Sequence, residues 1–149
     1  MRSNIYLILI FTCTVSFSQS KYKAILKSID DSQKTYAEIA QQIWSYAEMG
    51  YQEAQSSALL QKTLNDQGFK IEAGVAEIPT AFVASFGSGS PVIAILGEFD
   101  ALPGLSQQAV PYKASNNGKA GHACGHHLFG TASAAAAIAI KEYMEKEGK

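Results

Sequence analysis

The chain has 149 residues, of which 47% are hydrophobic and 17% are charged, and its formal net charge is −1. This length suits one domain, and the composition is that of an ordinary globular protein rather than a disordered or fibrous one. A chain so close to neutral offers no basic surface for nucleic acid or for an anionic membrane, so we expect neither as a partner.

The first eighteen residues are typical of a signal peptide. Arg2 supplies a positive start, and residues 5–15 form an apolar segment that is too short to span a bilayer. Small residues then stand where a signal peptidase cuts, so we expect cleavage after Ser18 and export of residues 19–149 without a stable membrane span. An uncleaved buried strand or anchor is the alternative interpretation.

Two helices are predicted at the start of the mature chain. Residues 21–48 carry apolar side chains at three- and four-residue spacings, although the polar run 30–32 can interrupt the helix and Gly50 is expected to end it. The apolar positions are Ile25, Ile29, Ile39, Ile43 and Ala47. Residues 53–67 predict a second helix, with Gly68 as its C-terminal stop.

The hydrophobic period then changes from helical to alternating. Residues 69–73 and 80–86 predict two half-buried strands, the second with Phe82, Ala84 and Phe86 on one side. Residues 92–96 are apolar throughout, which predicts a strand covered on both faces, as in an α/β sheet. A long polar loop follows over 104–119, and loops of that length in compact domains are usually functional. Residues from about 126 to 145 predict a final helix.

An acidic motif, Gly97-Glu98-Phe99-Asp100, comes directly after the predicted buried strand. Functional sites in open α/β sheets gather at the carboxyl ends of strands, so Asp100 is a candidate catalytic residue. A loop-capping role is the alternative for Asp100, and no partner for Glu98 is evident.

The segment 121–127 reads Gly-His-Ala-Cys-Gly-His-His and holds every histidine of the chain. Thiolate and imidazole groups are preferred ligands of zinc and related metals, and a helix N-terminus favours the thiolate form. We therefore predict a metal site in which Cys124 and His126 bind one ion. A cysteine hydrolase, with Cys124 as nucleophile and a histidine as base, is the rival interpretation. Cleavage of the signal peptide would leave Cys124 as the only cysteine, which excludes an intramolecular disulfide.

Two motifs together carry a family resemblance. Residues 96–107 (LGEFDALPGLSQ), followed by residues 121–127 (GHACGHH), resemble the metal-dependent amidohydrolases of the aminoacylase and carboxypeptidase G superfamily. The branch that contains the aminobenzoyl-glutamate hydrolases is the most similar, and hydrolases of auxin–amino acid conjugates are more distant. Residues 48–54 resemble the N-terminal helix-turn-helix of this family, so that the resemblance covers about residues 33–142.

The resemblance implies an α/β fold, namely the N-terminal part of a zinc-peptidase-like catalytic domain with helices packed on a mixed sheet. It also implies that the catalytic glutamate, further ligand histidines and a lid or dimerisation domain lie beyond the last predicted helix. We therefore expect residues 19–149 to be the N-terminal portion of a longer, homodimeric enzyme and to be inactive alone. A catalytically inactive remnant that binds metal or pairs with a partner chain is the alternative.

The same resemblance implies roles for individual residues. Cys124, as a bridging thiolate, and His126 would bind a pair of divalent ions, which could be zinc, manganese, cobalt or nickel, and Asp100 would orient the site. His122 and His127 would stand behind these ligands, although the family commonly has Asp or Asn at the position of His127. The implied reaction is hydrolysis of an amide bond in a small acyl amino acid such as aminobenzoyl-glutamate, by a metal-activated water and a glutamate base.

Overall fold

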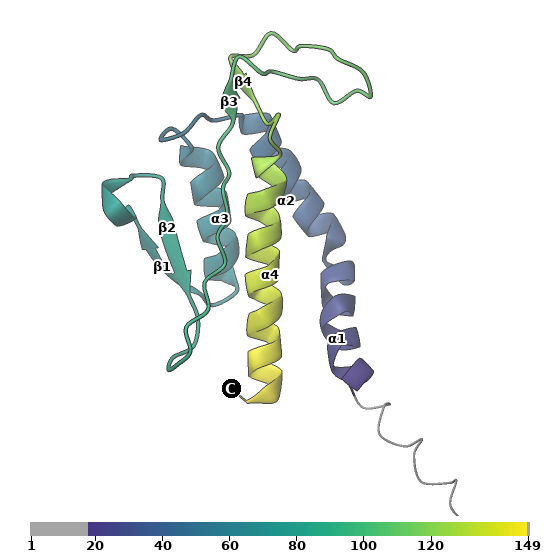
Figure 1. The fold of residues 1–149 in the computed structure, drawn as a ribbon, viewed down its shortest axis with the longest axis vertical. Coiled ribbons are helices and arrows are strands. Elements are labelled where there is room, and N and C mark those ends of the chain that lie inside the picture. Colours follow the sequence, from purple (N-terminus) through teal and green to yellow (C-terminus); the bar gives the residue numbers. More distant parts are fainter. Residues whose placement is uncertain (1–17, 149) are drawn as a thin grey trace, which may run out of the picture.

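The computed structural model describes residues 18–148 of the chain (Figure 1). The expected signal peptide lies outside the described residues, apart from Ser18 at the start of the first helix. The helices are α1 (Ser18–Asp31), α2 (Gln33–Tyr46), α3 (Ala54–Asp66), the short 3-10 helix η1 (Val75–Glu77) and α4 (His126–Glu147). The strands are β1 (Lys70–Ala73), β2 (Phe82–Ser85), β3 (Leu102–Pro103) and β4 (Ala120–Gly121). Within residues 18–148, no helix is both long and apolar enough to cross a membrane.

The first predicted helix is two helices in the structure. Ser32 separates α1 from α2, as the polar run at this point allowed. The prediction that Gly50 ends the helix is wrong, because α2 stops at Tyr46. Ala47 adopts a left-handed conformation with φ 48° and ψ 45°, and its N–H donates to the carbonyl of Ile43. The left-handed turn that glycine usually supplies is therefore made by an alanine here.

The core lies where α2, α3 and α4 meet, with α4 packed against the other two helices (Figure 1). Ile43 is fully buried there, which fits the helical spacing of the apolar residues on α2. The buried core residues are Ile39, Ile43, Leu60, Leu64, Phe69, Ala134 and Ile138. Both α3 and α4 were predicted from the sequence, and each begins and ends within about two residues of its predicted bounds.

Two small antiparallel ladders complete the fold. Strands β1 and β2 pair with Lys70 opposite Ser85, and the predicted alternation on the second strand is confirmed because Phe82, Ala84 and Phe86 pack against the core. Strands β3 and β4 pair in the same antiparallel sense and close the base of the long loop. The structure is thus of the α/β class, with helices packed against small antiparallel sheets, as expected for part of a peptidase-like domain.

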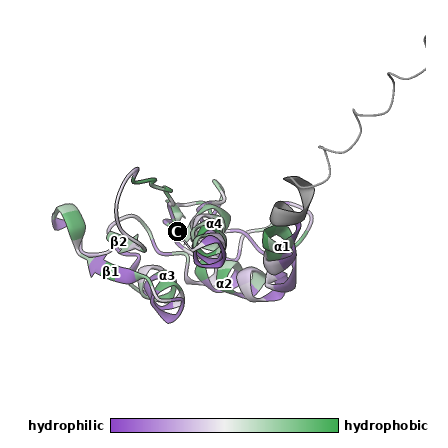
Figure 2. Ribbon diagram, turned by 90° about the horizontal axis from the view of Figure 1, so that it is seen from below, coloured by the Kyte–Doolittle hydropathy of each residue, from purple (hydrophilic) through white to green (hydrophobic). Residues whose placement is uncertain are grey.

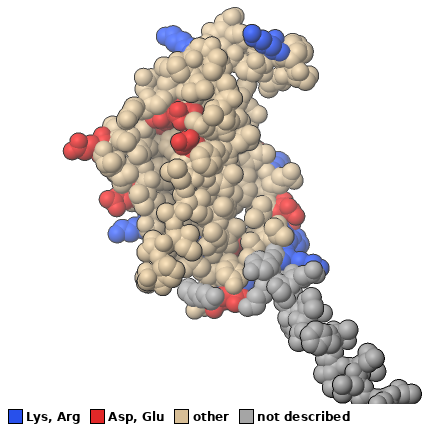
Figure 3. Space-filling view, viewed as in Figure 1, with Lys and Arg blue, Asp and Glu red and all other residues tan. Residues whose placement is uncertain are grey.

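The prediction of a buried strand over 92–96 is wrong for the residues described. The segment is extended, but no described strand pairs with it, and the exposed fractions of Val92, Ile93 and Leu96 are 87%, 79% and 73%. The segment runs beside α4 on the side away from α2 and α3, where it forms a green, hydrophobic stretch in Figure 2. The middle of this face of the molecule carries few charged side chains (Figure 3). An all-apolar strand is normally enclosed by neighbouring strands and by layers on both faces. Among residues 18–148 no strand pairs with this segment, and α4 lies along one side of it only.

Candidate functional site

The candidate site lies where the extended segment 97–100 passes the first turns of α4. Two glycines allow this close approach. A side-chain carbon at Gly130 would lie 2.8 Å from the backbone oxygen of Glu98, and one at Gly97 would lie 3.0 Å from the Cβ atom of Ser133. The hydroxyl of Ser133 donates to the carbonyl of Leu96 at 2.6 Å, which fixes the segment along the helix. The acidic motif is therefore held against the helix that carries the histidines.

His126 lies between two carboxylates. Its Nδ1 atom is 2.7 Å from Oδ1 of Asp100, and its Nε2 atom is 3.1 Å from Oε2 of Glu98. The exposed fractions of the side chains are 17% for His126, 31% for Asp100 and 50% for Glu98. The structure thus brings the candidate residue Asp100 into direct contact with the candidate ligand His126.

No partner for Glu98 is evident from the sequence, yet the structure gives it one. Glu98 and Asp100 are two residues apart on an extended segment, so their side chains point to the same face. That spacing was a usable signal, because any group that contacts Asp100 on this face is also within reach of Glu98.

The backbone next to Asp100 is anchored by the turn after α2. The N–H of Ala101 donates to the carbonyl of Glu48 at 2.7 Å, and Met49 forms a parallel bridge with Ala101. The Glu48 carboxylate in turn accepts hydrogen bonds from the first turn of α3. The turn over 47–53 therefore connects α3 to the site.

Cys124 stands in the loop before α4 and is a free, exposed thiol. The loop turns at Gly125, whose φ of 81° is a left-handed conformation that favours glycine, and α4 begins at the next residue. Among residues 18–148, no three or more His, Cys, Asp and Glu side chains are gathered closely enough to hold a metal ion. Asp100 and Glu98 each contact the ring of His126, but the three side chains do not form a cluster that could hold an ion, and the thiol of Cys124 is exposed.

His122, which is buried, and His127, which is partly buried, form a contacting pair next to the site. Their ring centroids are 4.9 Å apart, and the Nε2 atom of His122 donates to the carbonyl of Ile43 at 3.1 Å. Burial lowers the pKa of both histidines. The neighbouring His126 lowers the pKa of His122 further, and His122 in turn lowers the pKa of His127. The hydrogen bond to Ile43 opposes this shift in His122. His122 thus joins the loop to the last turn of α2.

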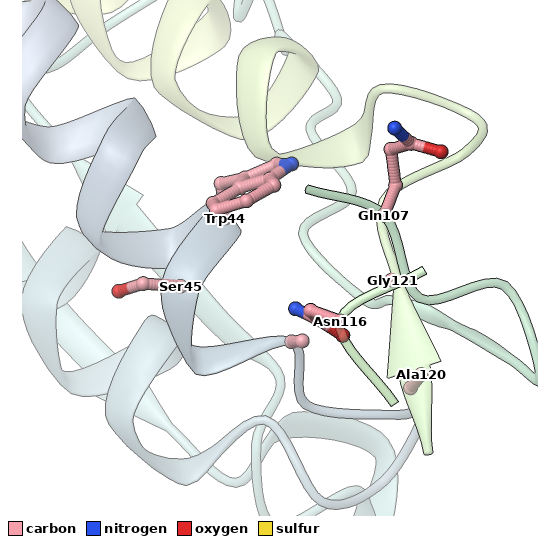
Figure 4. A pocket seen from close by; sticks show the side chains of 7 residues that line it. Trp44, Ser45, Gln107, Asn116, Ala120 and Gly121 are labelled. Atoms are coloured by element: carbon pink, nitrogen blue, oxygen red, sulfur yellow. The ribbon is translucent and has the colours of Figure 1, made fainter. Parts of the chain in front are cut away.

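A hollow of about 210 Å³ lies beside this loop, between the end of α2 and the long loop (Figure 4). Trp44 borders it from α2, while Gln107 and Asn116 border it from the loop. Its lining residues are Trp44, Ser45, Ala47, Gln107, Asn116, Ala120 and Gly121. None of Asp100, Cys124 or His126 lines it, so this hollow is separate from the candidate site.

Comparison with known proteins identifies the family. No family model matches the chain. The chain is 46% identical over 133 residues to one of the subunits of p-aminobenzoyl-glutamate hydrolase from Escherichia coli, an alignment that covers 88% of this chain and 28% of that protein. The chain belongs to this family of amidohydrolases and carboxypeptidases.

More distant members of the family match a similar part of the chain. Identity is 32% over 108 residues to thermostable carboxypeptidase 1 of Saccharolobus solfataricus, covering 71% of this chain and 26% of that protein. Identity is 28% over 107 residues to N-acetyl-L-cysteine deacetylase of Bacillus subtilis, covering 72% of this chain and 26% of that protein. The chain thus spans about a quarter of the length of these relatives. Enzymes of this family are generally metal-dependent.

Proposed function

We propose that the chain supplies one half of the metal centre of an amidohydrolase that cleaves the amide bond of an N-acyl or N-aroyl amino acid. The observation that carries the proposal is His126, held between Asp100 and Glu98 at the start of α4, in a chain 46% identical to part of a p-aminobenzoyl-glutamate hydrolase. A substrate like aminobenzoyl-glutamate is the first to test, since the name of that relative specifies it.

The donor chemistry of the site fits a divalent metal ion. Imidazole, thiolate and carboxylate groups together suit zinc, manganese, cobalt or nickel. In this proposal Cys124 and His126 are ligands and Asp100 is the residue that positions His126. A carboxylate that accepts the Nδ1 proton fixes the ring so that Nε2 is free to bind a metal, an arrangement common around metal-bound histidines. His122 and His127 support the loop from the core side.

The bound ion would supply a water that ionises near neutral pH and would polarise the scissile carbonyl. The residues of this chain would orient the ligands of that ion. Asp100 holds the imidazole of His126 in one orientation, and the close packing at Gly130 keeps Glu98 beside it. The family resemblance assigns the general base to a glutamate outside residues 19–149, so we propose that the chain alone does not turn over substrate.

Further features of the whole enzyme belong to the same proposal. We propose a pair of divalent ions, with Cys124 as the bridging thiolate, and a homodimeric parent in which residues 19–149 form the N-terminal portion of the catalytic domain. Export after cleavage at Ser18 is also proposed. Intact-mass measurement on the exported fraction should then give a chain that begins at Gln19.

A chimera tests the function directly. The matched 133-residue segment of the Escherichia coli relative is replaced by the corresponding segment of this chain, and hydrolysis of p-aminobenzoyl-glutamate is followed by chromatography. The chimera should hydrolyse the substrate in the presence of a divalent metal, and Cys124→Ser and His126→Ala should abolish turnover. Glu72→Gln, an exposed change on β1, is the matched control and should leave activity intact.

Two outcomes would overturn the proposal. A folded, metal-loaded chimera without activity would favour the inactive remnant. Full activity in metal-free buffer, abolished by alkylation of Cys124, would favour the cysteine hydrolase.

A further inference from the structure

The hollow beside the long loop is one end of a longer groove. A second hollow of about 400 Å³ adjoins it, between the turn after α2 and the same loop, and the two share part of their lining. None of Glu98, Asp100, Cys124 or His126 lines either hollow. The groove is large enough for a small organic molecule, since ligand sites measure about 300–1,000 Å³. The shared lining residues are Ser45, Ala47, Asn116 and Ala120.

The loop side of this groove is held by hydrogen bonds within the loop. The N–H of Gln108 donates to the carbonyl of Ala114 at 2.8 Å, and the hydroxyl oxygens of Ser106 and Ser115 are 2.8 Å apart. These contacts fix the course of the loop. The side chains that the loop presents to the groove are therefore held opposite the end of α2.

The groove presents hydrogen-bond donors. Oδ1 of Asn116 accepts the N–H of Gly118 at 2.9 Å, which fixes the orientation of the amide and leaves Nδ2 as a donor. In Figure 4 this nitrogen points towards the end of α2. Trp44 borders the same space, and its indole nitrogen can only donate. Lys119 lines the second hollow and makes no ion pair with any residue that the structure describes.

The acidic side chain of the groove is already occupied. Glu48 lines the second hollow, but its carboxylate accepts hydrogen bonds from Gln55 and Ser56 at the start of α3. The positive charge of Lys119 therefore has no carboxylate to meet within the groove, and an anionic acceptor suits it. The indole of Trp44 adds a surface on which an aromatic ring can pack in an offset or edge-to-face arrangement.

We propose that the groove binds a small aromatic carboxylate. Its ring packs against Trp44, and its carboxylate accepts hydrogen bonds from Nδ2 of Asn116 and Nζ of Lys119. This site goes beyond the proposed function, because it uses none of the proposed metal ligands and needs no metal ion for its occupation.

Fluorescence tests the proposal, because Trp44 is the only tryptophan of the chain and borders the groove. The 149-residue chain is titrated with benzoate in a buffer that contains a chelator. Benzoate should change the emission saturably, with a Kd of roughly 1 mM for a ligand of this size. Benzamide keeps the ring but lacks the charge, and cyclohexanecarboxylate keeps the charge but lacks the aromatic ring. Each should bind at least about threefold more weakly than benzoate.

Two variants test the donors. Lys119→Met removes the ammonium group and keeps most of the stem, so binding should weaken by about threefold to fivefold, as for an exposed charged pair. Asn116→Asp keeps an acceptor for Gly118 but replaces Nδ2 with a carboxylate oxygen, so binding should weaken by at least about tenfold. Lys113→Met is the matched control, because Lys113 is an exposed lysine of the same loop that lines neither hollow, and it should match wild type.

Three results would overturn the proposal. They are no saturable change in the emission of folded wild type, an equal affinity for benzoate and either analogue, or wild-type affinity for benzoate in both Lys119→Met and Asn116→Asp. Urea unfolding shows whether each variant is folded, and if neither is, the comparison of benzoate with its analogues on wild type decides. Because the titration contains a chelator, its failure leaves the proposed metal centre untouched.

Discussion

Glu48 caps helix α3 from outside the helix, and its removal should destabilise the fold next to the site. Its carboxylate accepts four hydrogen bonds. They come from N and Nε2 of Gln55, at 3.0 and 3.3 Å, and from N and Oγ of Ser56, both at 2.8 Å. Because α3 begins at Ala54, the two backbone donors are the second and third N–H groups of the helix, which an N-cap side chain normally satisfies.

The expected cost follows from these contacts. Loss of a helix cap typically costs about 1 kcal/mol. Ser56 is fully buried, so Glu48→Ala also leaves its donors without a partner, and an unsatisfied buried donor costs about 1–3 kcal/mol. We therefore expect Glu48→Ala to lower the free energy of unfolding by about 2 kcal/mol. Glu48→Gln keeps an acceptor oxygen but loses the charge at the positive helix end, so about 1 kcal/mol is expected.

The same contacts predict a pH dependence. Burial by itself raises the pKa of Glu48, but the hydrogen bonds from Gln55 and Ser56 outweigh it and hold the pKa below its ordinary value of 4.5. Because the folded-state pKa is the lower one, this stabilisation is fully present above about pH 4.5 and is lost as the pH falls towards the folded-state value. Glu48→Gln should remove this part of the acid sensitivity.

Urea unfolding near neutral pH and at about pH 4 measures both effects in wild type, Glu48→Ala, Glu48→Gln and the control Glu72→Gln. Glu72 is an exposed residue of β1, so its variant should unfold with the wild type at neutral pH. The reasoning is refuted if Glu48→Ala unfolds at the wild-type midpoint. It is also refuted if Glu48→Gln and wild type lose the same stability between the two pH values.

Three further predictions concern the segment beside α4 and the metal ligands. Gly130→Ala would place a methyl group 2.8 Å from the backbone oxygen of Glu98, so we expect a loss of about 1–3 kcal/mol in urea unfolding, and an unchanged midpoint would contradict the close approach. Ile93→Lys should change the free energy of unfolding of the isolated chain by no more than about 0.5 kcal/mol, because that side chain is 79% exposed, and a larger loss would show that the segment is covered. Cys124→Ser should lower the metal content measured by elemental analysis more than His127→Ala does, and equal losses would argue against a ligand role for the thiol.

The elements built from local pattern were predicted from the sequence. The helical spacing of apolar residues predicted α2, the stop at Gly68 predicted the end of α3, and the alternation of Phe82, Ala84 and Phe86 predicted β2. The cluster 121–127 was expected at the N-terminus of the last helix, and α4 begins within the cluster at His126. Each of these signals lies within a few residues of the element it predicts, because helical and strand periods are properties of the local backbone.

Contacts between distant residues were decided only by the tertiary structure. The hydrogen bond from His122 to Ile43 joins residues 79 positions apart, and no local signal predicts it. The contact of Glu98 with His126 depends on how closely Gly130 lets the extended segment approach α4. The apolar run 92–96 led to a wrong prediction of burial, because hydrophobicity is a property of the residues themselves. Burial also requires neighbouring strands and a covering layer, and these depend on how the whole polypeptide packs.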